Sequence, residues 1–213
     1  MYKTFYRPVP IEEHLVYEGK VYAASSTASL LKTASQLKQT TTSSLELDSS
    51  PVREVEPSQH KEFKDPVLNA VVALTNETAR SGYGVLVFCS SRQGCESNAR
   101  LISRVLPQAY ELDPATAEKR SDLLGDLRSL STGLDPTLAE TIQAGVAFHH
   151  AGMTTEERDL ISTAYDAGAL KVIVATCSLA AGINLPARRV ILHGARMGRD
   201  LVGPSSELVF RPR

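Results

Sequence analysis

The sequence has few cysteines, no basic excess and no long apolar run. Cys89, Cys95 and Cys177 are too few and too scattered for a disulfide framework or a zinc site, so we expect reduced thiols inside a cell. The net charge of −1 offers no general basic field for nucleic acid, although local basic groups and amide donors can still hold a phosphate backbone. No apolar stretch approaches the length of a membrane span, and residues 1–10 lack the apolar core of a signal peptide. These features predict an intracellular protein.

Several motifs of nucleotide and hydrolase chemistry are also missing. The 213 residues contain neither a GxxxxGK[ST] phosphate loop nor an acidic DExH box after a strand. No GxSxG elbow supports a Ser-His-Asp hydrolase, and no GxGxxG supports a nucleotide-binding redox domain. The composition, with 42% hydrophobic and 22% charged residues, is that of an ordinary globular protein long enough to bury a core.

The chain divides into zones of different composition. Residues 1–22 alternate apolar and polar side chains around prolines, which predicts one extended strand. Residues 23–64 are rich in Ser and Thr and poor in large apolar side chains, which predicts a flexible loop with one short helix at most. From residue 65 onward the chain alternates helix and strand patterns, and this part carries the fold.

Short apolar runs separated by helical spacing predict an α/β fold with a parallel sheet and helices on both faces. The predicted strands are the runs at residues 85–88, 146–148, 171–176 and 188–192. The predicted helices lie at residues 66–80, 95–106, 117–130 and 154–168. The last of these begins after an N-cap at Thr154 or Thr155 and ends at Gly168.

Ligands of an open parallel sheet bind at the carboxyl ends of its strands. This rule selects CSSR (89–92), HHAGM (149–153), TCSLAAGINLPA (176–187) and HGARMGRD (193–200). In CSSR, two hydroxyls and a guanidinium suit a phosphate, but an ordinary Ser-rich turn explains the same residues.

The segments after the other strands differ in how strongly they indicate a ligand site. His149 and His150 are adjacent in extended backbone and point to opposite sides, so they cannot chelate one metal, and a hydrogen-bonding loop histidine is the default interpretation. Residues 176–187 combine hydroxyls with small residues that let backbone amides approach an anion. A helix-capping turn explains Gly182 there but leaves Asn184 and the hydroxyls unexplained.

Residues 148–192 resemble the second RecA-like domain of superfamily 2 helicases, in the branch of DNA polymerase theta and its stand-alone relatives. VLVFCSSR resembles motif IV, ATCSLAAGINLPARRVI resembles motif V, and FYRPVP resembles the stretch that joins the two motor domains. The resemblance covers about 150 residues and implies a connecting segment at 1–22, a RecA-like domain at 65–204 and a divergent, truncated tail at 205–213.

The resemblance also implies roles for individual residues. Nucleic-acid contacts would come from motif IV, motif V and a strand-separating hairpin at 194–204, namely from Ser90, Ser91, Arg92, Thr176, Ser178, Arg196 and Arg199. Gly182 and Asn184 would lie at the nucleotide cleft between the two motor domains. No catalytic residue and no metal ligand are assigned in this chain.

The sequence departs from the pattern of complete superfamily 2 helicases in two ways. The 213 residues lack the phosphate loop and acidic box of a first motor domain, and Arg211 and Arg213 are not in the GRxGR context of motif VI. We therefore expect a truncated chain that is inactive alone, whose parent is an ATP- and Mg²⁺-dependent DNA helicase of nuclear DNA repair. Its expected partners are single-stranded or partly duplex DNA and the first motor domain. An RNA helicase fragment of a neighbouring branch and a non-catalytic interaction fragment remain as alternatives.

Overall fold

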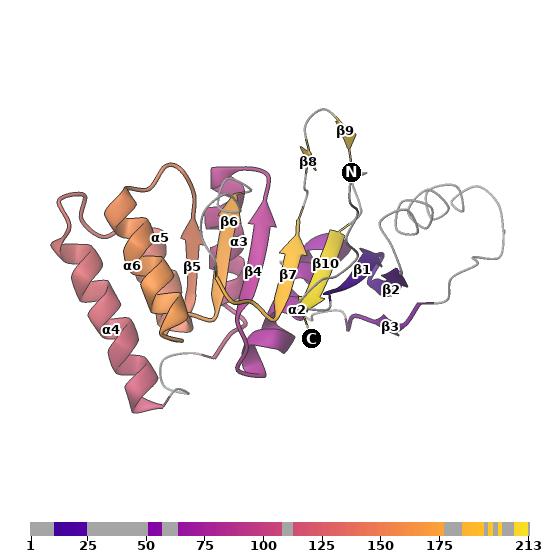
Figure 1. The fold of residues 1–213 in the computed structure, drawn as a ribbon, viewed down its shortest axis with the longest axis horizontal. Helices are drawn as coiled ribbons and strands as arrows, with labels where there is room; N and C mark the ends of the chain where they lie inside the picture. The colour runs from indigo at the N-terminus through magenta and orange to yellow at the C-terminus, as the bar shows by residue number, and fades with distance from the viewer. Residues whose placement is uncertain are drawn as a thin grey trace, which may run out of the picture.

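The computed structural model describes residues 11–24, 51–56, 64–107, 113–176, 185–193, 196–197, 200–201 and 207–212. An eight-stranded sheet runs through them in the order β3-β2-β1-β10-β7-β4-β6-β5 (Figure 1). Its parallel half consists of β4 (Val85–Cys89), β5 (Val146–His149), β6 (Val172–Thr176) and β7 (Arg189–Leu192).

The parallel pairing predicted from the sequence is confirmed. β4 lies between β6 and β7, with Val85 opposite both Val172 and Arg189, and β6 also pairs with β5. The strands β4, β5 and β6 are almost entirely buried, as expected for apolar strands that are covered on both faces. The carboxyl ends of all these strands therefore meet at one edge of the sheet.

An antiparallel half extends the sheet, which the sequence did not predict. β1 (Ile11–Tyr17) and β2 (Lys20–Ala24) form a hairpin where one strand was expected. Its turn places Glu18 at φ 47° and Gly19 at φ 74°, the left-handed conformation that matches a two-residue hairpin turn. β3 (Arg53–Glu54) pairs with β2. Within the predicted loop 23–64, the structure thus describes the end of β2 and a short segment that contains β3.

β10 (Glu207–Pro212) joins the two halves of the sheet. It pairs antiparallel with β1 on one side and with β7 on the other. Residues 205–213 were expected to be a divergent tail, and this strand was missed because ELVFRP lacks flanking turn signals and a following helix. The sheet is consequently mixed, with a parallel half at the β5 edge and antiparallel strands at the β3 edge.

Each α-helix in the described part of the chain begins at a side chain that accepts a backbone N–H, as polar N-cap residues do. The helices are α2 (Pro66–Arg80), α3 (Arg92–Ser103), α4 (Pro114–Ser129), α5 (Pro136–Thr141) and α6 (Thr155–Asp166), and the 3₁₀ turn η3 (Ile142–Ala144) follows α5. Their N-caps are Asp65, Ser91, Asp113, Asp135 and Thr154. The helix predicted near residues 117–130 is confirmed as α4.

The helices cover both faces of the parallel strands, as predicted (Figure 1). The chain crosses from β4 to β5 in one direction along the sheet and returns from β5 to β6 in the other. Because such crossovers are right-handed, α3 and α6 lie on opposite faces. α2 packs beside α3, and α4 packs against α6.

A buried arginine connects α4 to the sheet. Arg120 is 5% exposed and donates to the carbonyl oxygens of Ala169 at 2.9 Å and Gln143 at 2.7 Å. Gly145 lies against this guanidinium with φ 79°, so any side chain at that position would collide with Arg120. These carbonyls give the buried guanidinium its hydrogen-bond acceptors, and the bonds connect α4 to the loops that lead into β5 and β6.

Candidate functional site

The candidate site is the edge of the sheet where the parallel strands end, which we call the carboxyl edge. It is formed by residues 89–92 after β4, 149–153 after β5, Thr176 at the end of β6 and His193 after β7. Cys89 is opposite Thr176 in the register of β4 and β6, so these two segments are direct neighbours. The structure thus brings together motif-like segments that are far apart in the sequence.

Ser90, Ser91 and Arg92 form the turn from β4 into α3. Ser90 and Arg92 are exposed. The hydroxyl oxygen of Ser91 accepts the N–H of Gly94 at 3.0 Å and caps α3. Ser91 thus has the structural role of the ordinary-turn interpretation, while the exposed hydroxyl of Ser90 and the guanidinium of Arg92 are available to a ligand at the start of a helix, where anions are favoured.

The loop after β5 is held by His150. Its Nε2 lies 3.2 Å from the carboxylate of Glu96 on α3, and its Nδ1 accepts the N–H of Gly152 at 3.1 Å. The ring also stacks on Phe148 at a centroid distance of 5.0 Å and an interplanar angle of 9°. Since Nδ1 accepts a hydrogen bond, the proton of the neutral ring is on Nε2 and points to Glu96. His150 is therefore the hydrogen-bonding loop histidine that the sequence indicated.

His149 points away from His150, as adjacent residues of a strand do. It is 3% exposed, and its Nε2 has no hydrogen-bond partner among the described residues. Burial, followed by the positive charge of Arg158, lowers the pKa of His149 to about 4. His149 is thus a neutral core side chain at neutral pH.

A second group at the carboxyl edge was missed by the sequence reasoning. The side-chain amide of Asn98 donates to Cys89 Sγ at 3.1 Å and lies 2.9 Å from His193 Nδ1. The N–H of His193 also donates to the carbonyl oxygen of Phe88 at 2.8 Å. The only signal in the sequence is an Asn on the apolar side of a helix, which does not identify its partners on two separate strands.

Some of the predicted site residues lie outside the described residues. These are Ser178, Gly182, Asn184 and Arg199. The backbone of Arg196 belongs to β8 (Arg196–Met197), which pairs antiparallel with β9 (Asp200–Leu201). Paired strands therefore occur within the segment 194–204, where the resemblance implies a hairpin.

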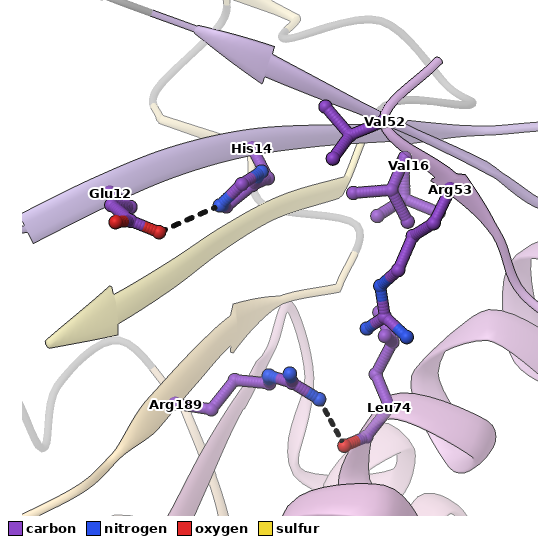
Figure 2. Close-up of a pocket in the computed structure, with 8 residues that line it drawn as sticks. Glu12, His14, Val16, Val52, Arg53, Leu74 and Arg189 are labelled. Atoms are coloured by element: carbon purple, nitrogen blue, oxygen red, sulfur yellow. Dashed lines mark hydrogen bonds and ion pairs between the residues drawn. The ribbon is translucent and has the colours of Figure 1, made fainter. Parts of the chain in front are cut away.

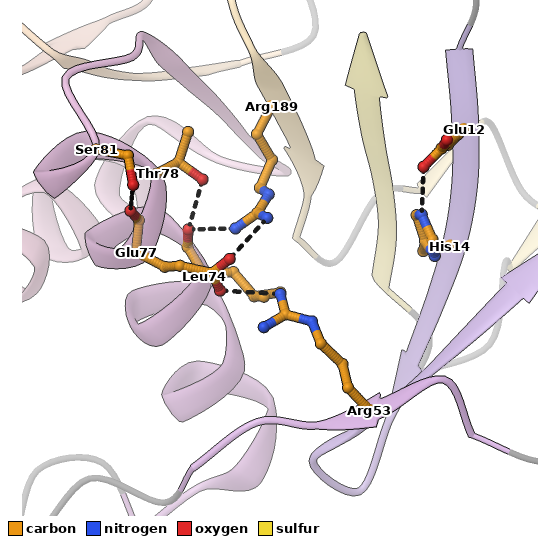
Figure 3. Close-up of polar contacts among 8 residues, drawn as sticks. All are labelled: Glu12, His14, Arg53, Leu74, Glu77, Thr78, Ser81 and Arg189. Atoms are coloured by element: carbon orange, nitrogen blue, oxygen red, sulfur yellow. Dashed lines mark hydrogen bonds and ion pairs between the residues drawn. The ribbon is translucent and has the colours of Figure 1, made fainter. Parts of the chain in front are cut away.

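A separate cavity lies away from the carboxyl edge, between the antiparallel strands and α2 (Figure 2). It has a volume of about 200 Å³ and is lined by Glu12, His14, Val16, Val21, Val52, Arg53, Leu74 and Arg189. At its base Arg189 donates to the carbonyl oxygen of Leu74 at 2.7 Å, and Arg189 and Arg53 share the carboxylate of Glu77 at 3.3 and 2.9 Å (Figure 3).

In this network the negative charge of Glu77 lies between the positive charges of Arg53 and Arg189. Partial burial alone would raise the pKa of Glu77, but the hydrogen bond from Arg53 and the charge of Arg189 outweigh it and lower the pKa. The buried Arg189 is thereby neutralised, which a buried cation requires. We interpret the network as the connection between β3, β7 and α2.

Within the described part of the chain, no helix has the length and apolar character needed to span a membrane. The parallel half of the sheet, with helices on both faces and polar loops at its carboxyl edge, has the arrangement of a RecA-like α/β domain.

Comparison with known proteins shows which RecA-like proteins this chain is similar to. Residues 128–201 match the family model of the helicase conserved C-terminal domain. The chain is 40% identical over 152 residues to "Helicase POLQ-like" of Drosophila melanogaster, an alignment that covers 71% of this chain and 14% of that protein. It is 35% identical over 206 residues to DNA polymerase theta of Mus musculus, covering 91% of this chain and 7% of that protein.

A further relative is also a DNA helicase by its name. The ATP-dependent DNA helicase Hel308 of Methanocella arvoryzae is 42% identical over 138 residues, covering 62% of this chain and 18% of that protein. The chain thus carries a helicase C-terminal domain related to those of DNA polymerase theta and the POLQ-like and Hel308 helicases, and it spans less than a fifth of each of these relatives.

Proposed function

We propose that this chain is the second motor domain of an ATP-dependent DNA helicase and that its carboxyl edge holds the phosphate backbone of a single strand. The observation that carries the proposal is the placement of the Ser90–Arg92 turn beside Thr176, at the edge of a domain related to DNA helicases. Phosphates are the same in every sequence, so a motor that moves along DNA needs this kind of contact.

The individual contacts belong to the same proposal. Ser90, Ser91 and Arg92 contact the backbone from the turn after β4, and Thr176 and Ser178 contact it from the end of β6. Arg196 and Arg199 act at the junction between single-stranded and duplex DNA. The exposure of Ser90 and Arg92 supports their part in this arrangement.

The nucleotide is bound in the complete protein. The first motor domain supplies the phosphate loop and the ligands of Mg²⁺, and Gly182 and Asn184 face ATP across the cleft between the domains. This chain contains no phosphate loop of its own, so it contributes one wall of the site and does not hydrolyse ATP alone. A place in nuclear DNA repair is part of the same proposal, and the relatedness to a DNA polymerase and to DNA helicases supports action on DNA.

The test is the affinity of the chain for single-stranded DNA, measured by fluorescence anisotropy. Replacement of Arg92 by Ala should weaken binding at least about tenfold, because a charge-assisted hydrogen bond contributes on the order of 1.5–3 kcal/mol. The loss should be equal for oligonucleotides of different base sequence, and the salt dependence should fall by about one counterion.

Arg80→Ala is the matched control. Arg80 is an exposed arginine in the last turn of α2, before β4 begins, and so lies at the opposite end of the parallel strands. Equal losses in the two variants would contradict the assignment of the carboxyl edge. Tighter binding to RNA of the same sequence would favour an RNA helicase of a neighbouring branch instead.

A further inference from the structure

Two of the cysteines lie on either side of the Ser90–Arg92 turn. Cys89 is the last residue of β4, and Cys95 is in the first turns of α3. Both are buried, at 4% and 0% exposure, and neither forms a disulfide. A Cβ atom built on Gly94 would lie 3.7 Å from Cys89 Cβ, so the start of α3 packs directly on this cysteine.

Hydrogen-bond donors surround the sulfur of Cys89. The Cys95 thiol and the His193 ring are hydrogen-bonded to it, and the Asn98 amide donates to it at 3.1 Å. These donors, with Cys95 first, lower the pKa of Cys89 although burial opposes them. Donors of this kind stabilise a thiolate, the form that reacts with oxidants.

We propose that Cys89 and Cys95 are a redox pair, which hydrogen peroxide converts to a disulfide. The Cys89 thiolate attacks one peroxide oxygen, the O–O bond breaks, and hydroxide leaves to take up a proton as water. The sulfenic acid on Cys89 is then attacked by the sulfur of Cys95, the S–O bond breaks, and a second water leaves with the Cys95 proton. The sulfurs lose the electron pair that reduces the peroxide.

The disulfide would act on the turn between the two cysteines. It would close a loop of residues 90–94, which includes the Ser91 cap and its bond to Gly94. It would also bond to Cys95 the Cys89 sulfur that now accepts the Asn98 amide hydrogen. On the basis of the proposed function, oxidation should therefore weaken single-strand binding, because it displaces Ser90 and Arg92.

Peptide mapping of the whole chain tests the pair directly. Trypsin cleaves after Arg80, Arg92 and Arg100, which places Cys89 in the peptide of residues 81–92 and Cys95 in that of residues 93–100. After peroxide treatment and alkylation, we expect a linked product of these two peptides, with a mass two hydrogens below their sum, that disappears on reduction. Cys177, in the peptide of residues 172–188, is the internal comparison.

Two results would overturn the redox pair. One is a digest in which Cys89 and Cys95 stay unmodified while Cys177 is oxidised, and the other is a link from Cys89 to Cys177. In a Cys95→Ala variant, Cys89 should accumulate as a sulfenic acid that dimedone traps, and failure to trap it would also count against the pair. The wild-type digest decides the question even if this variant folds poorly.

The same samples separate this inference from the proposed function. If the link forms, single-strand affinity falls about tenfold and reduction restores it, then the redox pair and the proposed DNA contact both hold. A loss of this size is expected when one charged contact is broken. If the link forms and affinity is unchanged, the redox pair stands and the placement of the strand on the Ser90–Arg92 turn is wrong.

Discussion

At the scale of single residues, the buried polar groups of the carboxyl edge differ in how many of their hydrogen bonds are formed. Asn98 uses its amide to contact both Cys89 and His193, while His149 leaves a ring nitrogen without a partner among the described residues. A buried polar atom without a partner costs stability, and for a histidine this cost depends on pH.

We expect His149 to make the fold sensitive to mild acid. Its pKa is about 4 in the folded chain, against 6.5 for an unperturbed imidazole. Above pH 6.5 both states are neutral and stability is complete. As the pH falls from 6.5 towards 4, the unfolded chain binds the proton first, so stability is lost. At pH 5 the loss should be about 2 kcal/mol.

Urea unfolding at pH 7.5 and pH 5 measures this loss in the wild type and in a His149→Leu variant. The free energy of unfolding should fall between these pH values by about 2 kcal/mol less in the variant than in the wild type, because the variant has no imidazole to protonate at this position. Burial also lowers the pKa of His14, but that contribution is the same in both proteins and cancels. Equal losses would show that His149 does not titrate in this range.

At the scale of elements, α6 is the most completely specified helix. The Thr154 hydroxyl accepts the N–H of Glu157 at 3.2 Å, and the Glu157 carboxylate accepts the N–H of Thr154 at 2.7 Å. This capping box, with Glu156 in the first turn, satisfies donors that every helix leaves open at its start. The helix connects β5 to β6, so its start fixes the end of the 149–153 loop.

Replacing Thr154 by Ala should lower the unfolding free energy by about 1 kcal/mol, the usual cost of losing an N-cap. Thr163→Ala is the matched control, since Thr163 is exposed in the last turn of the same helix and should change stability by less than about 0.5 kcal/mol. Denaturant unfolding of both variants is the measurement. If Thr163→Ala lowers the unfolding free energy as much as Thr154→Ala does, the capping box does not stabilise the helix more than an ordinary exposed threonine.

At the scale of the whole molecule, the parallel and antiparallel halves of the sheet have different contents. The parallel half carries the helicase-like segments, while the cavity and the Arg53–Glu77–Arg189 network lie where β7 and α2 meet the antiparallel strands. The charge of the chain is almost balanced, so any affinity for DNA depends on where cations lie and not on their sum.

We expect the purified chain to release no phosphate from ATP above background, with or without single-stranded DNA. Phosphoryl transfer needs a phosphate cradle, a magnesium ligand and a charge-stabilising arginine, and the 213 residues contain no phosphate loop or DExH box. A phosphate-release assay measures this, with a mock purification from cells that lack the gene as control. DNA-stimulated turnover that exceeds the mock sample would contradict the expectation.

The sequence by itself determined the parallel half of the fold. Continuous apolar runs such as residues 85–88 and 172–175 must be buried on both faces, and the helical spacing between them leaves a parallel sheet as the solution. It also narrowed the N-cap of α6 to Thr154 or Thr155, and the structure places the cap at Thr154, with its capping-box partner three residues on at Glu157. The positions of Ser90, Arg92 and Thr176 at strand ends follow from the same local patterns.

Only the tertiary structure decided which distant residues meet. Asn98 joins Cys89 to His193, and Arg189 reaches Leu74 and Glu77, across separations that no local pattern encodes. β10 was missed for the same reason, since a strand of six residues is specified by its neighbours β1 and β7 and not by its own sequence. Hydrophobic periodicity acts within an element, whereas hydrogen bonds between buried polar groups depend on how the elements pack, and so they emerge only in the folded chain.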